Sequence, residues 1–191
     1  MQFIIEKAKT QFQQMVNNFG SDPYHLISHV PEAEKWAKFM LKKYPQANEE
    51  VVLLAVWLHD IGHYPIPTDI DHAIRSEQRA EEFLVSESYP KDEMKEVLHC
   101  VRAHRCSDVI PETLEAKIMA FIDSASHMTD SMYFDIARDD KEKNDSFRVY
   151  AKMERDLRDL ASFPEIQKDM IGIYNAWKKL IEEYEKINFI I

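Results

Sequence analysis

The sequence predicts an all-α protein with a single domain. Apolar residues recur at helical spacing along most of the chain, and no segment alternates apolar and polar residues as a half-buried strand would. Only 3 of the 191 residues are glycine, which also favours helices. The chain is long enough for one sizeable core, and neither a repeat nor a linker is readable. We therefore expect one domain over residues 1–191.

Prolines and polar stretches divide the apolar pattern into successive helices. Pro31 lies inside the second helix and is expected to kink it or to mark where its regular part begins. The stretch 63–71 contains two prolines and predicts a loop, and the polar stretch 129–143 predicts a short helix and a loop. The other expected helices cover about 2–18, 24–44, 51–58, 72–86, 90–105, 111–128, 145–162 and 164–187.

The run Val51–Leu58 is apolar on every side, which indicates an element that is buried all round. A strand of a parallel sheet is the rival interpretation, but the run is long for a strand and helical patterns flank it. Asn48 is a suitable N-cap and Gly62 a suitable stop for a helix here. The run ends in His59 and Asp60, and burying these two groups without partners is costly. A metal ion at the helix end would satisfy both.

His59-Asp60, at the end of an apolar helix and followed by Ile61-Gly62, resembles the signature of the HD-domain superfamily of metal-dependent phosphohydrolases. The pattern of that family is a first histidine, then the His-Asp pair, then a distant aspartate, all on helices around one metal site. The resemblance covers roughly residues 24–128, the motif core. It implies a helical bundle of the HD type, with the C-terminal helices, about 145–187, packed on that core.

The resemblance implies that His29 and Asp123 complete the first metal site. His29 fits the first histidine of the family better than His25, because a small apolar residue, Ala33, follows it four positions later. His25 would then lie behind the ligands or at the surface. Asp123 is the carboxylate in the apolar segment 116–125, where a buried charge needs a partner. The alternative for Asp123 is an ion pair with a lysine or arginine across a helix interface.

His72 and His104 resemble the further histidines of members that hold two metals. His99 lies five residues before His104, so on a helix of 3.6 residues per turn it points well away from that side. With these two residues the set would hold two metals, and Asp60 would be the natural bridge. A surface position is the alternative for each histidine. Imidazoles and carboxylates without a thiolate suit Mn, Fe, Co, Zn or Mg, and spacing does not choose among them.

Two arginines are candidates for binding a substrate phosphate. Arg75 lies three residues after His72 on the same helix face, and a guanidinium there could hold a phosphate through two hydrogen bonds. Arg105 lies beside His104. A surface charge is the alternative for each arginine. His63 stands where the 5′-nucleotidases of the family carry a glutamate, so activity on nucleoside monophosphates that depends on that glutamate is not supported.

The resemblance and the candidate ligands predict a metal-dependent phosphohydrolase that cleaves a small phosphate ester or nucleotide with metal-activated water, with Asp60 as its catalytic carboxylate. The alternatives are a di-iron oxygenase of the HD type and a non-catalytic nucleotide-binding domain. The net charge of −10 argues against a nucleic-acid polymer as partner. Because the N-terminus lacks a signal peptide and no apolar run could span a bilayer, we expect a cytoplasmic protein without a membrane partner. The sequence predicts no oligomeric state.

Overall fold

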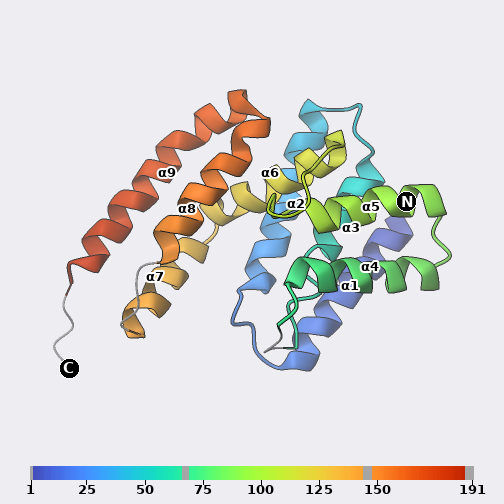
Figure 1. Cartoon of the computed structure of the whole chain (residues 1–191), viewed down its shortest axis with the longest axis horizontal. Coiled ribbons are helices and arrows are strands. Elements are labelled where there is room, and N and C mark those ends of the chain that lie inside the picture. The colour runs from blue at the N-terminus through green and yellow to red at the C-terminus, as the bar shows by residue number, and fades with distance from the viewer. Residues whose placement is uncertain (1, 66–68, 144–147, 188–191) are drawn as a thin grey trace. The chain divides into compact units, whose positions relative to one another are not determined.

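The computed structural model describes residues 2–65, 69–143 and 148–187, and these residues form α-helices, one short 3-10 segment and no strand (Figure 1). The predicted all-α fold is confirmed. Residues 66–68 of the expected loop and residues 145–147 of the expected helix 145–162 lie outside the described residues. The helices are α1 (Gln2–Phe19), α2 (Leu26–Lys43), α3 (Glu49–Leu58), α4 (His72–Ser86), α5 (Lys91–Ala103), α6 (Leu114–Thr129), α7 (Met132–Glu142), α8 (Arg148–Asp159), the 3-10 segment η1 (Leu160–Ser162) and α9 (Pro164–Glu185).

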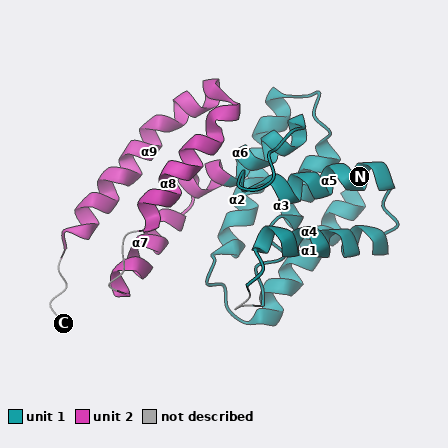
Figure 2. Ribbon diagram, in the orientation of Figure 1, with its two compact units in different colours: residues 1–123 teal, residues 124–191 magenta. Residues whose placement is uncertain are grey.

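Figure 2 shows two compact units, residues 1–123 and residues 124–191, and the boundary between them falls within α6. The expected organisation as one domain, with the C-terminal helices packed on the motif core, stays a prediction. All residues predicted to bind metal belong to the first unit. In the described part of the chain, no helix combines the length and the apolar character that crossing a bilayer requires.

The centre of the first unit is α3, which packs against α1, α2, α4 and α5. All its residues from Val51 to Leu58 are buried, as expected for a run that is apolar on every side. The helix begins where the Asn48 side chain accepts hydrogen bonds from the N–H groups of Glu50 and Val51, at 3.1 and 3.3 Å. The N–H of Asn48 donates to the carboxylate of Glu115 in α6, at 2.8 Å. Asn48 therefore fixes the start of the helix whose other end carries the His-Asp pair.

Asp22 holds the first turn of α2. Its carboxylate accepts hydrogen bonds from the N–H groups of Leu26 and Ile27, at 2.9 and 2.8 Å, which satisfies two donors that a helix start leaves open. The same carboxylate accepts a hydrogen bond at 2.7 Å from the hydroxyl of Tyr64, in the segment that follows the His-Asp pair. Asp22 thereby ties the first turn of α2, which carries His29, to the segment behind α3.

The turn after α3 lies directly on the backbone of α4. The Gly62 N–H donates to the Ser76 hydroxyl at 2.9 Å, and the Arg79 guanidinium donates to the Ile61 carbonyl at 2.6 Å. A Cβ atom on Gly62 would lie 2.6 Å from the backbone carbonyl oxygen of His72, so only glycine permits this approach. The contact brings His72, the first residue of α4, next to the His-Asp pair.

In the second unit α7 packs against α8 and α9, and α8 packs against α9. A buried aspartate, Asp156, is the centre of a polar network there. The Tyr133 hydroxyl donates to its carboxylate at 2.9 Å, and the Lys152 Nζ and His127 Nδ1 atoms each lie 3.2 Å from it. The network balances the buried charge of Asp156 within this unit.

Candidate metal centre

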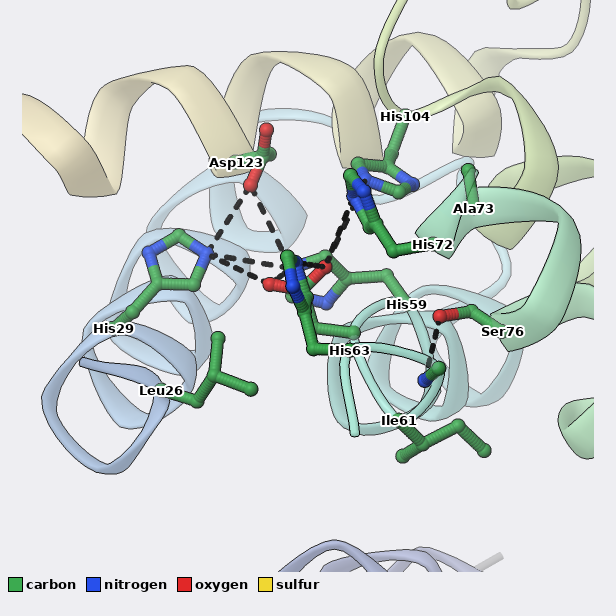
Figure 3. A network of polar contacts seen from close by, with 12 residues as sticks. Leu26, His29, His59, Ile61, His63, His72, Ala73, Ser76, His104 and Asp123 are labelled. Atoms are coloured by element: carbon green, nitrogen blue, oxygen red, sulfur yellow. Dashed lines mark hydrogen bonds and ion pairs between the residues drawn. The ribbon is translucent and has the colours of Figure 1, made fainter. Parts of the chain in front are cut away.

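Side chains from α2, α4, α6 and the end of α5 meet at the end of α3 (Figure 3). The His29 Nε2 atom lies 3.3 Å from His59 Nε2 and 3.1 Å from Asp123 Oδ1, and His59 Nε2 lies 3.5 Å from the same oxygen. Two ligands bound at about 2.1 Å to one ion, and at right angles to each other, are about 3.0 Å apart. These separations therefore suit a shared metal ion, and the three residues form one candidate ligand group.

Asp60, His63 and His72 form a second candidate group beside the first. The Asp60 Oδ1 atom lies 3.4 Å from His63 Nε2, 3.6 Å from His72 Nε2 and 3.8 Å from His104 Nε2. The Nε2 atoms of His72 and His104 are 3.3 Å apart. The structure thus places all six predicted ligands in one cluster, in which the role of each as a metal ligand stays a prediction.

The Asp60 carboxylate lies between the two groups. Its Oδ2 atom is 3.4 Å from His59 Nε2 and 3.8 Å from His29 Nε2, whereas its Oδ1 atom faces the histidines of the second group. A carboxylate with its two oxygens directed at separate sets of nitrogen donors has the arrangement of a bridge between two metal ions.

Backbone carbonyls orient two of the imidazoles. His59 donates from Nδ1 to the Val56 carbonyl at 2.8 Å, and His104 donates from Nδ1 to the Val101 carbonyl at 2.6 Å. Because a carbonyl can only accept, the proton of each neutral ring is on Nδ1 and the lone pair is on Nε2. Both Nε2 atoms face the cluster, which is how proteins usually hold metal-binding histidines.

One carboxylate oxygen of the cluster has no hydrogen-bond donor among the described residues. Asp60 Oδ1 is buried and makes no hydrogen bond to any described residue. An ionised oxygen buried in this way is costly unless positive charge compensates it. A divalent cation would supply that charge, and the nitrogen and oxygen donors suit Mn, Fe, Co, Zn or Mg. The residues present therefore fit a metal centre.

Burial and neighbouring charge set the protonation of the cluster. Burial lowers the pKa of His72 to about 3 and that of His104 to about 4, so both rings are neutral at pH 7. Burial opposes ionisation of Asp60, but the neighbouring imidazoles outweigh it and hold the pKa of this carboxyl well below its ordinary value. Burial also opposes the charge on His59, yet the Asp60 and Asp123 carboxylates raise its pKa. The neutral rings of His72 and His104 and the ionised carboxylate of Asp60 are therefore in the protonation states that bind metal.

One edge of the cluster reaches solvent. The exposed fraction of the side chain is 20% for His72, 15% for His63 and 14% for Asp123. The other three histidines of the cluster are at most 2% exposed. Among the described residues of the cluster, these three side chains are therefore the most accessible to solvent, while the buried histidines form the inner wall.

The guanidinium groups of the two arginines predicted to bind phosphate already have partners within the protein. Arg75 donates to the backbone carbonyls of Ile70 and Pro65, each at 3.1 Å. Arg105 forms an ion pair with Asp71, whose side chain caps the start of α4. Phosphate binding by either arginine stays a prediction, and it requires the guanidinium group to exchange these partners.

His25 and His99, which the sequence also offered as candidates, lie outside both ligand groups. His25 is the N-cap residue of α2 and has a left-handed backbone conformation, with φ of 57°. The Nε2 atom of His99 accepts a hydrogen bond from the Glu112 N–H at 3.1 Å.

His63 lies in the cluster although the sequence alone assigned it no role there. Its ring stacks on that of His72, with 4.0 Å between the ring centroids. The signal that could have found it is spacing. The His63 N–H donates to the Asp60 carbonyl at 3.1 Å in a tight turn, and residues three apart in such a turn share a face.

A comparison with protein families agrees with this geometry. The family model described as HD domain matches residues 26–128, which is more than half of the chain. Comparisons with curated proteins and with solved structures gave no significant match. The matched range extends from the start of α2 almost to the end of α6 and includes every residue of the cluster. The chain therefore belongs to the HD-domain family, whose members are mostly metal-dependent phosphohydrolases.

Proposed function

We propose that the protein is a metal-dependent phosphohydrolase that cleaves a small phosphate ester or nucleotide by attack of water. The observation that carries the proposal is the position of Asp60, with Oδ2 3.4 Å from His59 Nε2 and Oδ1 3.6 Å from His72 Nε2. Two ions, one held by His29, His59 and Asp123 and one by His72 and His104, with Asp60 between them, would suit in-line displacement at phosphorus, because they could stabilise both the attacking and the leaving oxygen. Membership of the HD-domain family also supports hydrolysis.

When bound, divalent ions would supply the Lewis acid and activate the attacking water. The side chains of the chain prepare the site for that chemistry. Ionised Asp60 holds the two halves of the centre in a fixed relation, and the buried rings of His59 and His104 keep their Nε2 lone pairs directed inward. His72 and Asp123, whose side chains reach solvent, are where a phosphate group could contact the cluster.

Ser76, which lies against the turn after the His-Asp pair, and Cys100, which lies in α5, are poorly suited to act as nucleophiles, which supports attack by water. The hydroxyl of Ser76 is buried and accepts a hydrogen bond from the Gly62 N–H. Burial raises the pKa of the Cys100 thiol, so this group stays protonated at neutral pH. Covalent catalysis needs an activated nucleophile beside a base, and neither residue meets that requirement.

Charge favours a small substrate over a polymer. The net charge of −10 would repel the long phosphate backbone of a nucleic acid. Ions in the cluster would reverse the field locally and attract a single phosphate group. Arg75 and Arg105, which lie next to the cluster, could add hydrogen bonds to that group if they exchanged their present partners.

The proposal can be tested with protein stripped of metal by a chelator. We expect no phosphate release from a panel of phosphate esters and nucleotides, and restored release when Mn²⁺, Co²⁺, Zn²⁺, Mg²⁺ or anaerobic Fe²⁺ is added. His59→Ala should lower the metal content and should lower kcat/KM by about a hundredfold or more. Loss of a residue behind the ligands already costs about 10- to 100-fold in metal affinity or activity. His99→Ala is the matched control, because that histidine lies outside both ligand groups.

Phosphate release that continues unchanged in excess chelator would contradict the proposed mechanism. Full metal content and activity in folded His59→Ala protein would contradict the site. Turnover that requires both iron and dioxygen would instead support an oxygenase.

A further inference from the structure

Building on the proposed metal centre, we propose that His63 is a third imidazole ligand of the second metal position, together with His72 and His104. That position would then have three nitrogen donors and the Oδ1 atom of Asp60. The HD motif itself does not assign this role, because His63 lies in the turn after the His-Asp pair.

The geometry of His63 matches that of the neighbouring histidine. Its Nε2 atom lies 3.4 Å from Asp60 Oδ1, slightly closer than the Nε2 atom of His72 at 3.6 Å. The two rings stack at 4.0 Å between centroids with an interplanar angle of 23°, so both approach the same oxygen from the same side. Figure 3 shows the His63 ring inside the cluster of labelled histidines. The donor atoms of Asp60, His63 and His72 all lie within 4.8 Å of one another.

Three contacts hold His63 in place. The Tyr24 ring packs on the face of His63, with 4.4 Å between the ring centroids, while His72 packs on it as well. The backbone N–H of His63 is bonded to the Asp60 carbonyl at 3.1 Å. The side chain is therefore positioned before any ion binds, which lowers the entropy cost of using it as a ligand.

The unsatisfied oxygen of Asp60 indicates what is missing at this position. Asp60 is 5% exposed, and its Oδ1 atom makes no hydrogen bond to a described residue although three imidazole nitrogens lie 3.4–3.8 Å away. These distances are too long for a good hydrogen bond. They suit instead an ion placed among the donor atoms of Asp60, His63 and His72, which lie within 4.8 Å of one another, with the His104 nitrogen 3.3 Å from that of His72.

A third imidazole would change the choice of metal at this position. Imidazole suits transition metals such as Zn²⁺, Fe²⁺ and Co²⁺, whereas Mg²⁺ prefers oxygen donors and retains several waters. We therefore expect the second position to bind Co²⁺ much more tightly than Mg²⁺. Loss of His63 should weaken Co²⁺ binding strongly and Mg²⁺ binding little.

Calorimetric titration of metal-free protein with Co²⁺ and with Mg²⁺ tests the proposal without reference to activity. We compare wild type with His63→Ala and His63→Gln, and use His99→Gln as the control histidine. Glutamine can still donate a hydrogen bond to Asp60 but is a poor ligand for Co²⁺, so it separates a ligand from a residue that only positions the carboxylate. Circular dichroism and melting curves establish that each variant is folded.

The expected result is two Co²⁺ equivalents in wild type and a second equivalent at least about tenfold weaker in both His63 variants, with the first equivalent unchanged. Unchanged Co²⁺ binding in folded His63→Ala, or full rescue by glutamine, would overturn the ligand role and leave the proposed hydrolase intact. A wild type that takes up one equivalent would overturn the second position. A wild type that binds no metal would overturn the proposed function itself.

Discussion

Gly62 shows how one residue without a side chain can determine the position of a ligand. A Cβ atom at this position would clash with the backbone N of Ser76, and would lie 2.6 Å from the His72 carbonyl oxygen and 2.7 Å from the Arg75 carbonyl carbon. All three neighbours are backbone atoms of α4, which cannot rotate away as a side chain could. The helix itself would have to move, and His72 would move with it.

We therefore predict that Gly62→Ala costs roughly 1–3 kcal/mol of stability, as overpacked sites do, and weakens binding of the second metal equivalent. Denaturant unfolding measures the first effect and metal titration the second. Gly172→Ala is the matched control, because a Cβ atom there would meet no described residue within 4 Å apart from its chain neighbours and the backbone of its own helix, α9. That substitution should be neutral or slightly stabilising. Equal stability of the two variants would show that α4 tolerates the displacement.

At the scale of elements, local signals were enough to predict the helices, whereas contacts between distant segments were not predictable. Apolar spacing placed the helix ends within a few residues, and Pro31 lies inside α2 without ending it. The start of α2 at Leu26 depends on Asp22, which also accepts a hydrogen bond from Tyr64, 42 positions away. The partners of the Arg75 guanidinium are backbone carbonyls of a loop, which leave no trace in residue identity.

The candidate site likewise contains residues that stand out in the sequence and one, His63, that does not. His29, His59 and Asp123 stand out in the sequence because each lies beside or within an apolar helical segment, where a polar group requires a reason. His63 lacks that contrast, because it stands in a polar loop with prolines on its C-terminal side. Its spacing of three residues from Asp60 is the one hint in the sequence, and that spacing becomes informative only once the tight turn at Asp60 is known.

The cap of α3 allows a prediction about an element. Asn48→Ala removes the side-chain acceptor of the Glu50 and Val51 N–H groups, and we expect it to cost about 0.5–2 kcal/mol in urea unfolding. Asn48→Ser should retain most of the stability, because serine is also a good N-cap residue. A stability of Asn48→Ala equal to that of wild type would mean that the contact of α6 with the Asn48 N–H is sufficient to fix this helix start.

At the scale of the whole molecule, the buried histidines link folding to pH. In the unfolded chain a histidine has a pKa of about 6.5, whereas in the fold the pKa is about 3 for His72 and about 4 for His104. Below pH 6.5 the unfolded chain therefore binds protons that the folded protein does not, and the free energy of unfolding falls as pH falls. His59 acts in the opposite sense, because its pKa is raised in the fold. The pH dependence of the free energy of unfolding is the sum of these opposing contributions, so it changes when one of the histidines is replaced.

For metal-free protein in excess chelator, we predict that urea unfolding gives a lower stability at pH 5 than at pH 7. A shift of one pKa unit corresponds to about 1.4 kcal/mol, so His104 alone can account for up to about 2 kcal/mol of this loss. His104→Asn removes that contribution. The variant should be less stable than wild type at pH 7, because a buried ring is lost, but should lose less stability on going to pH 5.

If His104→Asn shows the same loss between the two pH values as wild type, protonation of other groups must drive the acid sensitivity. The imidazole of His104 would then be free to take up a proton in the fold, contrary to its burial and to its hydrogen bond with the Val101 carbonyl.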